Sequence, residues 1–409
     1  MSAYRTPAEA KPLSGVRILA IEQMQALPFA TQLLARLGAD VVKVESVNGG
    51  DQARGSLPAI ADPQGRRVGA TFLRNNLNKR SVCIDLKSPA GRDLVLRLAK
   101  GFDVVAENSR PGSMAGLGLG YSHIAEVNPR AIYVSVSGFG NTVDTPYRNW
   151  PAFAPVVEAM SGLYEMKRVD GHPPQPAPAG ALGDIGAALF ATIGILAALR
   201  HREMTGAGQY VDIAMLDSVV AMTDIITNFW SMGASARSVG QLILRGFQAN
   251  DGWFMLQVGR EHQFERLANL IGHPEWLQDP RLASRQGWVD HMDDVIVPAI
   301  EGWAAGMTKV EVCHVLAEAG IAAGPCLRDD EVAADPHLAA RQMLVPIKRD
   351  DQPDRPVLVP ASPVRLSAMT ADADEPVPWL GQHTDEVLQS ELGLGADELS
   401  ALRTHQVIA

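Results

Sequence analysis

The chain has 409 residues, of which 46% are hydrophobic and 20% are charged, and its net charge at pH 7 is −10. This composition excludes a disordered chain and argues against a nucleic-acid-binding protein, which would carry a broad basic face. The length favours about two or three domains.

The expected compartment is the cytoplasm. The three cysteines, Cys83, Cys313 and Cys326, lie far apart without metal-ligand spacing, as is common in a reducing cytosol. Residues 1–15 lack the apolar stretch of a signal peptide. The longest apolar run, Ile185–Leu199, has 15 residues, fewer than the roughly 20 that cross a bilayer. We therefore expect a soluble protein without a membrane partner.

Strands and helices alternate over the first 140 residues. Apolar, β-branched segments predict buried strands, and between them lie helix signals such as Ser88 and Pro89 before a helix that ends at Gly101. This alternation is typical of an α/β fold, in which helices cover both faces of a parallel sheet. The predicted strands are 16–22, 39–45, 80–86, 102–108 and 131–138, and the predicted helices are 28–38, 88–101 and 121–127.

A ligand of such a sheet binds beyond the carboxyl ends of the strands. No G-x-G-x-x-G motif follows the first strand, which argues against a dinucleotide dehydrogenase. Residues 66–100 carry nine basic and two acidic side chains, which form either a solvated face or a site for a small polyanion such as a nucleotide-bearing cofactor. The strand ends are Gln23–Ala26, Ser46, Lys87, Asn108–Arg110 and Ser137–Gly140.

Motifs of metal and serine hydrolases are missing from the sequence. The ten histidines include no H-E-x-x-H pair, and the acidic cluster around His291 is typical of a charged helix surface. No G-x-S-x-G motif occurs either. We therefore expect no metal cofactor.

Asp184 stands between Gly183 and Gly186 at the start of an apolar helix that runs to about Arg202. One interpretation is a helix cap, whose carboxylate accepts a hydrogen bond from the first turn. The other is a nucleophile toward an activated acyl group, with nearby amide groups stabilising the oxyanion. On the second interpretation the glycines admit a bulky partner, and the helix amino terminus holds the carboxyl pKa well below about 3.9.

Four segments, 12–46, 78–112, 181–218 and 380–388, resemble the class III CoA-transferases, the group of formyl-CoA transferase and carnitine CoA-transferase. The resemblance favours the nucleophile. It implies that Asp184 attacks a donor thioester to form an aspartyl anhydride, that CoA then forms an aspartyl thioester, and that CoA finally passes to an acceptor acid. It also implies that Gln25 donates a hydrogen bond near the reacting carbonyl. The implied CoA contacts are Gln25, Ala26, Ile84, Lys87, Asn108, Ser109, Arg110, Ser137 and Gly138.

The resemblance also implies a homodimer of two interlocked rings, in which a large Rossmann-like domain is joined to a small one. On this basis we expect residues 1–202 to form the large CoA-binding domain, with about 340–409 completing it. We expect a linker helix over 203–230 and a smaller α+β domain over 231–330. The segment 231–246 reads as a loop.

Departures from the family pattern leave alternatives open. Ser46, Gly116 and Ser137 stand where relatives often have basic residues, so Lys87 and Arg110 become the main phosphate candidates.

An α-methylacyl-CoA racemase would need a histidine base upstream of Asp184, where this chain has Phe153 and Ala154. A third alternative is a CoA-binding protein without catalytic activity.

Overall fold

The computed structural model describes residues 11–166, 168–223, 226–234, 241–349, 352–369 and 373–409. It divides into two compact units. Unit 1 comprises Met1–Gly233 and Arg341–Ala409, and unit 2 comprises Ala234–Ala340. The carboxyl-terminal segment thus completes unit 1, while unit 2 is an insertion between its two parts.

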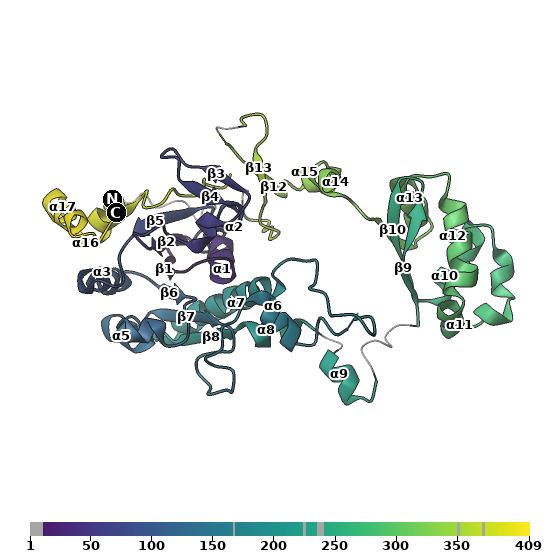
Figure 1. Cartoon of the computed structure of the whole chain (residues 1–409), viewed down its shortest axis with the longest axis horizontal. Coiled ribbons are helices and arrows are strands. Elements are labelled where there is room, and N and C mark those ends of the chain that lie inside the picture. Colours follow the sequence, from purple (N-terminus) through teal and green to yellow (C-terminus); the bar gives the residue numbers. More distant parts are fainter. Residues whose placement is uncertain (1–10, 167, 224–225, 235–240, 350–351, 370–372) are drawn as a thin grey trace. The chain divides into compact units, whose positions relative to one another are not determined.

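A six-stranded parallel sheet forms the centre of unit 1 (Figure 1). Its strand order is β5-β2-β1-β6-β7-β8, and every neighbouring pair is parallel. Helical crossovers between sequential strands produce this α/β arrangement, as the alternating pattern predicts. The strands are β1 (Arg17–Ile21), β2 (Asp40–Glu45), β5 (Lys79–Cys83), β6 (Val104–Glu107), β7 (Ile132–Ser137) and β8 (Tyr210–Ala214).

Each face of the sheet is covered by its own hydrophobic cluster. Ile18 and Ala20 of β1 face a cluster with α1 (Ala26–Arg36), α6 (Ala154–Met160), α7 (Leu182–Thr205) and α8 (Met215–Met222). The alternate residues Leu19 and Ile21 face α3 (Pro89–Ala99), α5 (Tyr121–Val127), α16 (Thr384–Leu392) and α17 (Ala396–Thr404). Because successive side chains of a strand point to opposite faces, one apolar strand supplies both clusters.

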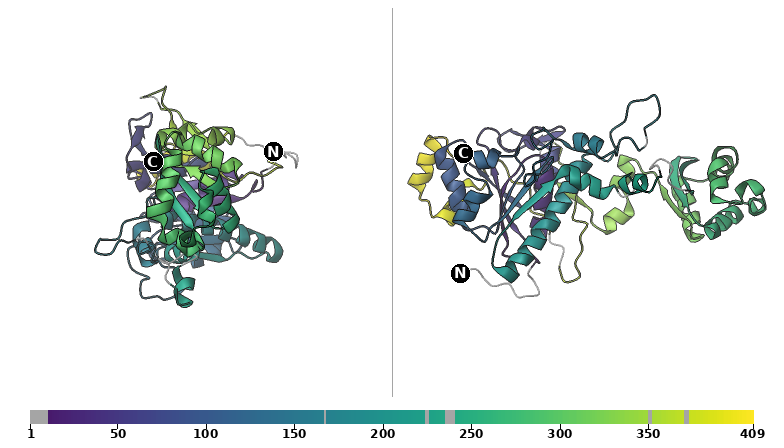
Figure 2. Two further views of the ribbon diagram at one scale, coloured as in Figure 1. Left: turned by 90° about the vertical axis from the view of Figure 1, so that its right-hand side faces the viewer. Right: turned by 90° about the horizontal axis from the view of Figure 1, so that it is seen from below.

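The last part of the chain packs against the first. Figure 2 shows the yellow helices α16 and α17 beside elements from the first quarter of the sequence. Ile408 pairs with Ile84 just beyond β5, and Thr384 Oγ1 accepts a hydrogen bond from the Cys83 backbone N–H at 3.1 Å. The carboxyl terminus is therefore built into the edge of the sheet that carries β5.

Segment 203–230 is not the single linker helix that the sequence predicts. Tyr210–Ala214 is β8, the sixth strand of the sheet, and it is followed by α8 and by α9 (Ile226–Ser231). The segment therefore belongs to unit 1, because β8 pairs along β7 from Tyr133 to Ser137.

Helix α7 is the one described helix with the length and composition of a membrane span, with a mean hydropathy of 2.0 over 18 residues. Half of that window is buried within the structure, where α7 packs against α1 and α8. The helix extends beyond the expected Arg202 to Thr205, and Gly206 ends it in a left-handed conformation. Burial in the core explains the apolar sequence.

Two small hairpins complete unit 1. They pair β3 (Ala59–Ala61) with β4 (Arg67–Gly69) and β12 (Leu344–Ile347) with β13 (Val357–Pro360). The proline-rich sequence of residues 352–367 disfavours a helix, and its one regular element is the short strand β13. The remaining short helices are η1 (Gln52–Gly55), α2 (Ala70–Asn75) and α4 (Ser113–Gly116).

Unit 2 is a small α+β unit around its own core. Its antiparallel sheet has the order β11-β10-β9, with β9 (Ile243–Ala249), β10 (Gly252–Val258) and β11 (Ala322–Pro325). Residues 243–246 of the expected loop thus lie in β9, and residues 235–240 lie outside the described part of the chain. The helices are α10 (Glu261–Leu270), η3 (Pro274–Leu277), η4 (Pro280–Leu282), α11 (Arg285–Asp290), the π-helix η5 (Met292–Ile296), α12 (Val297–Ala304), α13 (Lys309–Glu318), α14 (Asp329–Ala333) and α15 (Pro336–Ala340).

Candidate active site

Asp184 is the third residue of α7, but it does not cap that helix. The N-cap residue Ala181 makes no side-chain cap, and among the described residues no group donates a hydrogen bond to the Asp184 carboxylate. The bond to the first turn comes from a different helix, because Glu158 Oε1 of α6 accepts from the Gly183 N–H at 3.0 Å. The cap interpretation of Asp184 is therefore wrong.

The acidity of Asp184 also differs from the expectation. Burial, and then the negative charge of Glu158, raise the pKa of Asp184 to about 6. The helix amino terminus stabilises a carboxylate by only about 0.3–1 kcal/mol, so it does not compensate for lost hydration and a like charge. Asp184 is thus a half-buried carboxylate with enhanced basicity at neutral pH.

The two flanking glycines face packed side chains rather than open space. A Cβ at Gly183 would lie 2.8 Å from Val157 Cγ2 and 3.1 Å from the Ala154 Cα of α6. A Cβ at Gly186 would lie 2.3 Å from the terminal methyl of Met222 at the end of α8. Gly183 therefore lets α6 approach the first turn of α7, whereas the space beside Gly186 is filled by the end of the flexible Met222 side chain.

A cavity of about 270 Å³ opens at the carboxyl ends of β1, β2 and β5, as expected for a doubly covered parallel sheet. Five of the residues singled out from the sequence line it: Gln23, Ser46, Ile84, Lys87 and Ser109. Ile84 is fully buried, whereas Lys87 is exposed.

Other predicted residues lie near this edge without lining the cavity. Gln25 is the N-cap residue of α1, and Ala26 is buried as its first residue. Asn108 ties two strand ends together, since its side chain accepts from the Gln23 N–H and donates to the Gln23 carbonyl, both at 2.9 Å. Arg110 is exposed and, among the described residues, forms no ion pair, which leaves its guanidinium available to an anion.

Ser137 and Gly138 stand at the end of β7, outside the cavity lining. The Ser137 hydroxyl accepts a hydrogen bond from the Gly140 N–H at 3.0 Å, so it shapes the loop that follows the strand. A Cβ at Gly138 would lie 2.2 Å from that of Ala152, and the Gly138 carbonyl accepts from the Leu216 N–H at 3.1 Å. These contacts give both residues a structural role in the strand-end loops.

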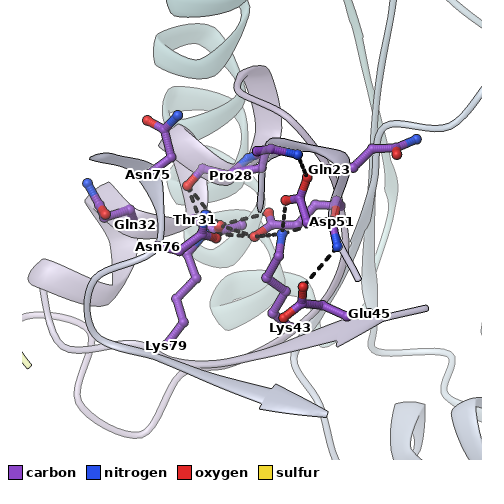
Figure 3. Close-up of polar contacts among 12 residues, drawn as sticks. Gln23, Pro28, Thr31, Gln32, Lys43, Glu45, Asp51, Asn75, Asn76 and Lys79 are labelled. Atoms are coloured by element: carbon purple, nitrogen blue, oxygen red, sulfur yellow. Dashed lines mark hydrogen bonds and ion pairs between the residues drawn. The ribbon is translucent and has the colours of Figure 1, made fainter. Parts of the chain in front are cut away.

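Sequence patterns did not reveal a buried ionic network behind the loop that leads to Gln25 (Figure 3). Lys43 has no exposed surface and lies 2.8 Å from Asp51 Oδ2, while Lys79 Nζ lies 2.7 Å from Glu22 Oε1. Burial alone would raise the pKa of Glu22, but the two ammonium groups hold it below its ordinary value. Burial lowers the pKa of Lys79 to about 8. Since Lys79 is inside the protein, it adds nothing to the basic surface suggested for residues 66–100.

This network fixes the backbone of the loop between β1 and α1. Lys43 Nζ donates to the Glu22 carbonyl at 3.0 Å, and Asp51 Oδ1 accepts from the Met24 N–H at 2.8 Å. Met24 has a φ of 64°, a conformation that non-glycine residues adopt rarely. The buried charges thus hold a strained residue immediately before Gln25.

Among the described residues, no cluster of three or more histidine, cysteine, aspartate or glutamate side chains is arranged to hold a metal ion.

Comparison with known proteins assigns the family. The model of CoA-transferase family III matches residues 13–384. The chain is 35% identical to succinyl-CoA–D-citramalate CoA-transferase of Chloroflexus aurantiacus, over all of both chains. It is 33% identical to formyl-CoA:oxalate CoA-transferase of Streptomyces avermitilis, over 97% of this chain and all of that one. A CAIB/BAIF family protein from Brucella suis has the same fold, with a TM-score of 0.82 and 30% identity over 94% of this chain and all of that one. The chain therefore belongs to CoA-transferase family III and is a class III CoA-transferase.

Proposed function

We propose that this enzyme moves CoA from an acyl-CoA donor to a carboxylic acid acceptor through covalent intermediates on Asp184. The observation that carries the proposal is the state of this carboxylate: it is half-buried, it accepts no hydrogen bond from the described residues, and its pKa is raised to about 6. A more basic carboxylate is a better nucleophile once it is ionised, and above pH 6 most of it is ionised.

We propose that the exchange proceeds through four successive nucleophilic attacks. The Asp184 carboxylate attacks the donor thioester carbonyl, which forms a mixed anhydride and releases the CoA thiolate. The thiolate attacks the aspartyl carbonyl, which forms an aspartyl-CoA thioester and releases the donor carboxylate. The acceptor carboxylate then attacks this thioester, which forms a second mixed anhydride and again releases the CoA thiolate. The thiolate attacks the acceptor acyl carbonyl of this anhydride, which forms the product acyl-CoA and releases the Asp184 carboxylate. Gln25, at the start of α1, is proposed to donate a hydrogen bond to the reacting carbonyl oxygen.

The strand-end cavity is the proposed CoA site. Lys87 lines it, and Arg110 lies on the loop after β6. We propose that these two cations bind the phosphates, because neither forms an ion pair among the described residues and charge-assisted bonds to phosphate are strong. The donor and acceptor acids stay open, since the relatives differ in the acids that their names give.

A homodimer of interlocked rings and a cytoplasmic location complete the proposal. Apolar side chains are exposed along α7, with Leu189 44%, Ile193 59% and Leu196 37% exposed. Trp230 of α9 is 79% exposed. Exposed apolar side chains along one helix favour a protein partner, and we propose that a second copy of the chain covers those of α7.

Trapping the covalent intermediate tests the proposal. Incubation with an acyl-CoA and hydroxylamine is expected to inactivate the enzyme and to leave a mass change on the peptide that contains Asp184. Asp184→Asn is expected to abolish transfer and the mass change while the protein stays folded. Full activity after trapping, or transfer by the Asp184→Asn variant, would contradict the mechanism. Deuterium exchange at the α-carbon of an acyl-CoA would instead favour the racemase, which is disfavoured because Phe153 and Ala154 occupy the base positions.

A further inference from the structure

A second carboxylate, Glu158, lies beside Asp184 and is more deeply buried. Its side chain is on α6 and only 1% of the residue is exposed. Glu158 Oε1 accepts from the Gly183 N–H at 3.0 Å, and Oε2 accepts from the Tyr164 hydroxyl at 2.5 Å. Both carboxylate oxygens are thus fixed by hydrogen bonds, in contrast to those of Asp184.

The bond to Gly183 is the helix-capping bond of α7. Free N–H groups in the first turn of a helix attract the nearest carboxylate, and an aspartate at the third helical position is close enough to compete for them. If the Asp184 carboxylate accepted such a hydrogen bond, its lone pairs would point toward the backbone N–H and would be less available to attack an acyl carbon. Glu158 occupies the Gly183 N–H, and the Asp184 carboxylate accepts no hydrogen bond from the described residues.

We propose that Glu158 is a positioning residue for the transfer reaction, which caps α7 in place of Asp184 and, by its negative charge, favours the acylated forms of Asp184. This inference rests on the proposed nucleophilic role of Asp184. Two neighbouring carboxylates repel each other while both are ionised. The repulsion ends when Asp184 becomes a neutral anhydride or thioester, because the negative charge leaves with the CoA thiolate or with the released acid. Glu158 therefore disfavours the free nucleophile relative to both covalent intermediates.

Other charged groups on the elements packed against α7 do not replace Glu158 in this role. They are Arg36 on α1, Asp212 on β8 and Asp217 on α8. Glu158 is the charged neighbour that acts on the Asp184 carboxyl group, after burial itself. The Tyr164 hydroxyl donates to Glu158 Oε2, and burial together with Glu158 raises the pKa of Tyr164 to about 12, so the phenol stays a donor at neutral pH.

Glu158→Gln separates the charge from the cap, because its amide oxygen still accepts from Gly183 and its amide group donates to the Tyr164 oxygen. In this variant we expect the acid limb of the kcat profile to move down by about one pH unit. We also expect the aspartyl-CoA thioester that accumulates with excess acyl-CoA, measured by mass spectrometry of the intact protein, to fall severalfold. Glu165→Gln is the matched control, since it removes an exposed carboxylate from the same segment. It is expected to change neither readout.

Glu158→Ala removes the cap as well as the charge. If Asp184 then bonds to the vacant N–H, kcat falls by about fivefold further, the equilibrium effect of a typical cap, while KM for acyl-CoA stays within twofold. An unchanged acid limb and unchanged thioester level in a folded Glu158→Gln variant would overturn the inference. Transfer by Asp184→Asn would overturn the proposed function instead, so the two failures are distinguishable.

Discussion

The effect of Asp184→Asn on the free energy of unfolding shows whether Asp184 stabilises the fold. A loss of stability indicates a structural role, and a gain indicates that the carboxylate is retained for another reason, such as the reaction. If Asp184 served the helix terminus, loss of its charge would cost about 0.3–1 kcal/mol of unfolding free energy. The observed surroundings predict the opposite sign. Burial and the charge of Glu158 disfavour the ionised carboxylate in the folded protein, so a neutral side chain of the same shape is expected to stabilise it.

The magnitude follows from the acidity. The pKa of Asp184 rises from 3.8 to about 6, and at 1.36 kcal/mol per unit this corresponds to about 3 kcal/mol. The side chain is partly exposed, and solvent screening reduces the expected gain to about 1–3 kcal/mol. Because the folded-state pKa lies above the unfolded one, the penalty is absent below about pH 4, grows between pH 4 and 6, and is complete above pH 6. Asp184→Asn should therefore gain stability at pH 7 and almost none at pH 4.

The assay is urea unfolding of the wild type and the variant at equal protein concentration, between pH 4 and pH 8. Ser88→Ala provides the control in the same unit, because Ser88 is a real side-chain cap of α3. It is expected to lose about 0.5–1 kcal/mol at every pH. A lower stability of Asp184→Asn at pH 7, or a gain that does not change with pH, would refute the reasoning.

Three further outcomes are expected. The kcat of transfer should rise about tenfold from pH 5 to pH 7 through one ionisation, whereas an aspartate of ordinary acidity would give a flat profile; stopped assays with saturating acyl-CoA check this. Lys87→Ala and Arg110→Ala should each raise KM for acyl-CoA about tenfold and leave KM for the acyl-pantetheine thioester unchanged, since the latter lacks the nucleotide phosphates. Lys43→Met should lower the unfolding free energy by about 3–5 kcal/mol, because it removes the ammonium group that pairs with the buried Asp51 carboxylate; denaturation shows this, and a loss below about 1 kcal/mol would contradict it.

Local periodicity was sufficient for most of the fold. The apolar run of β1 and the capped helix after Ser88 need only neighbouring residues to be recognised, and both are confirmed. The role of segment 210–214 was not accessible in this way. The residues Tyr210–Ala214 are typical of a short strand, but the place of this strand in the sheet depends on pairing with β7, more than seventy residues earlier in the chain.

In the candidate active site, too, some features follow from neighbouring residues and others depend on residues that are distant in the sequence. The position of Asp184 in the first turn of a helix follows from its own neighbours. Its raised pKa depends first on burial by the tertiary fold and then on Glu158, which is 26 residues earlier. One signal was present, namely a single glutamate within the apolar segment 154–160. A charged side chain is fully buried only when it is paired or hydrogen-bonded, as Glu158 and Lys43 are.

Gly183 connects the two carboxylates. Helix α6 approaches α7 so closely that any side chain at Gly183 would collide with Val157 or Ala154, and this approach brings Glu158 within bonding distance of the Gly183 N–H. The glycine thus acts through backbone and packing, and not by leaving space for an acyl group. A reactive carboxylate at a helix terminus would otherwise be drawn into the hydrogen bonds of that terminus. In this structure Glu158 accepts the hydrogen bond from the helix terminus, and Asp184 accepts none. Gly183 makes this arrangement possible, because the absence of a side chain there lets α6 bring Glu158 to the first turn of α7.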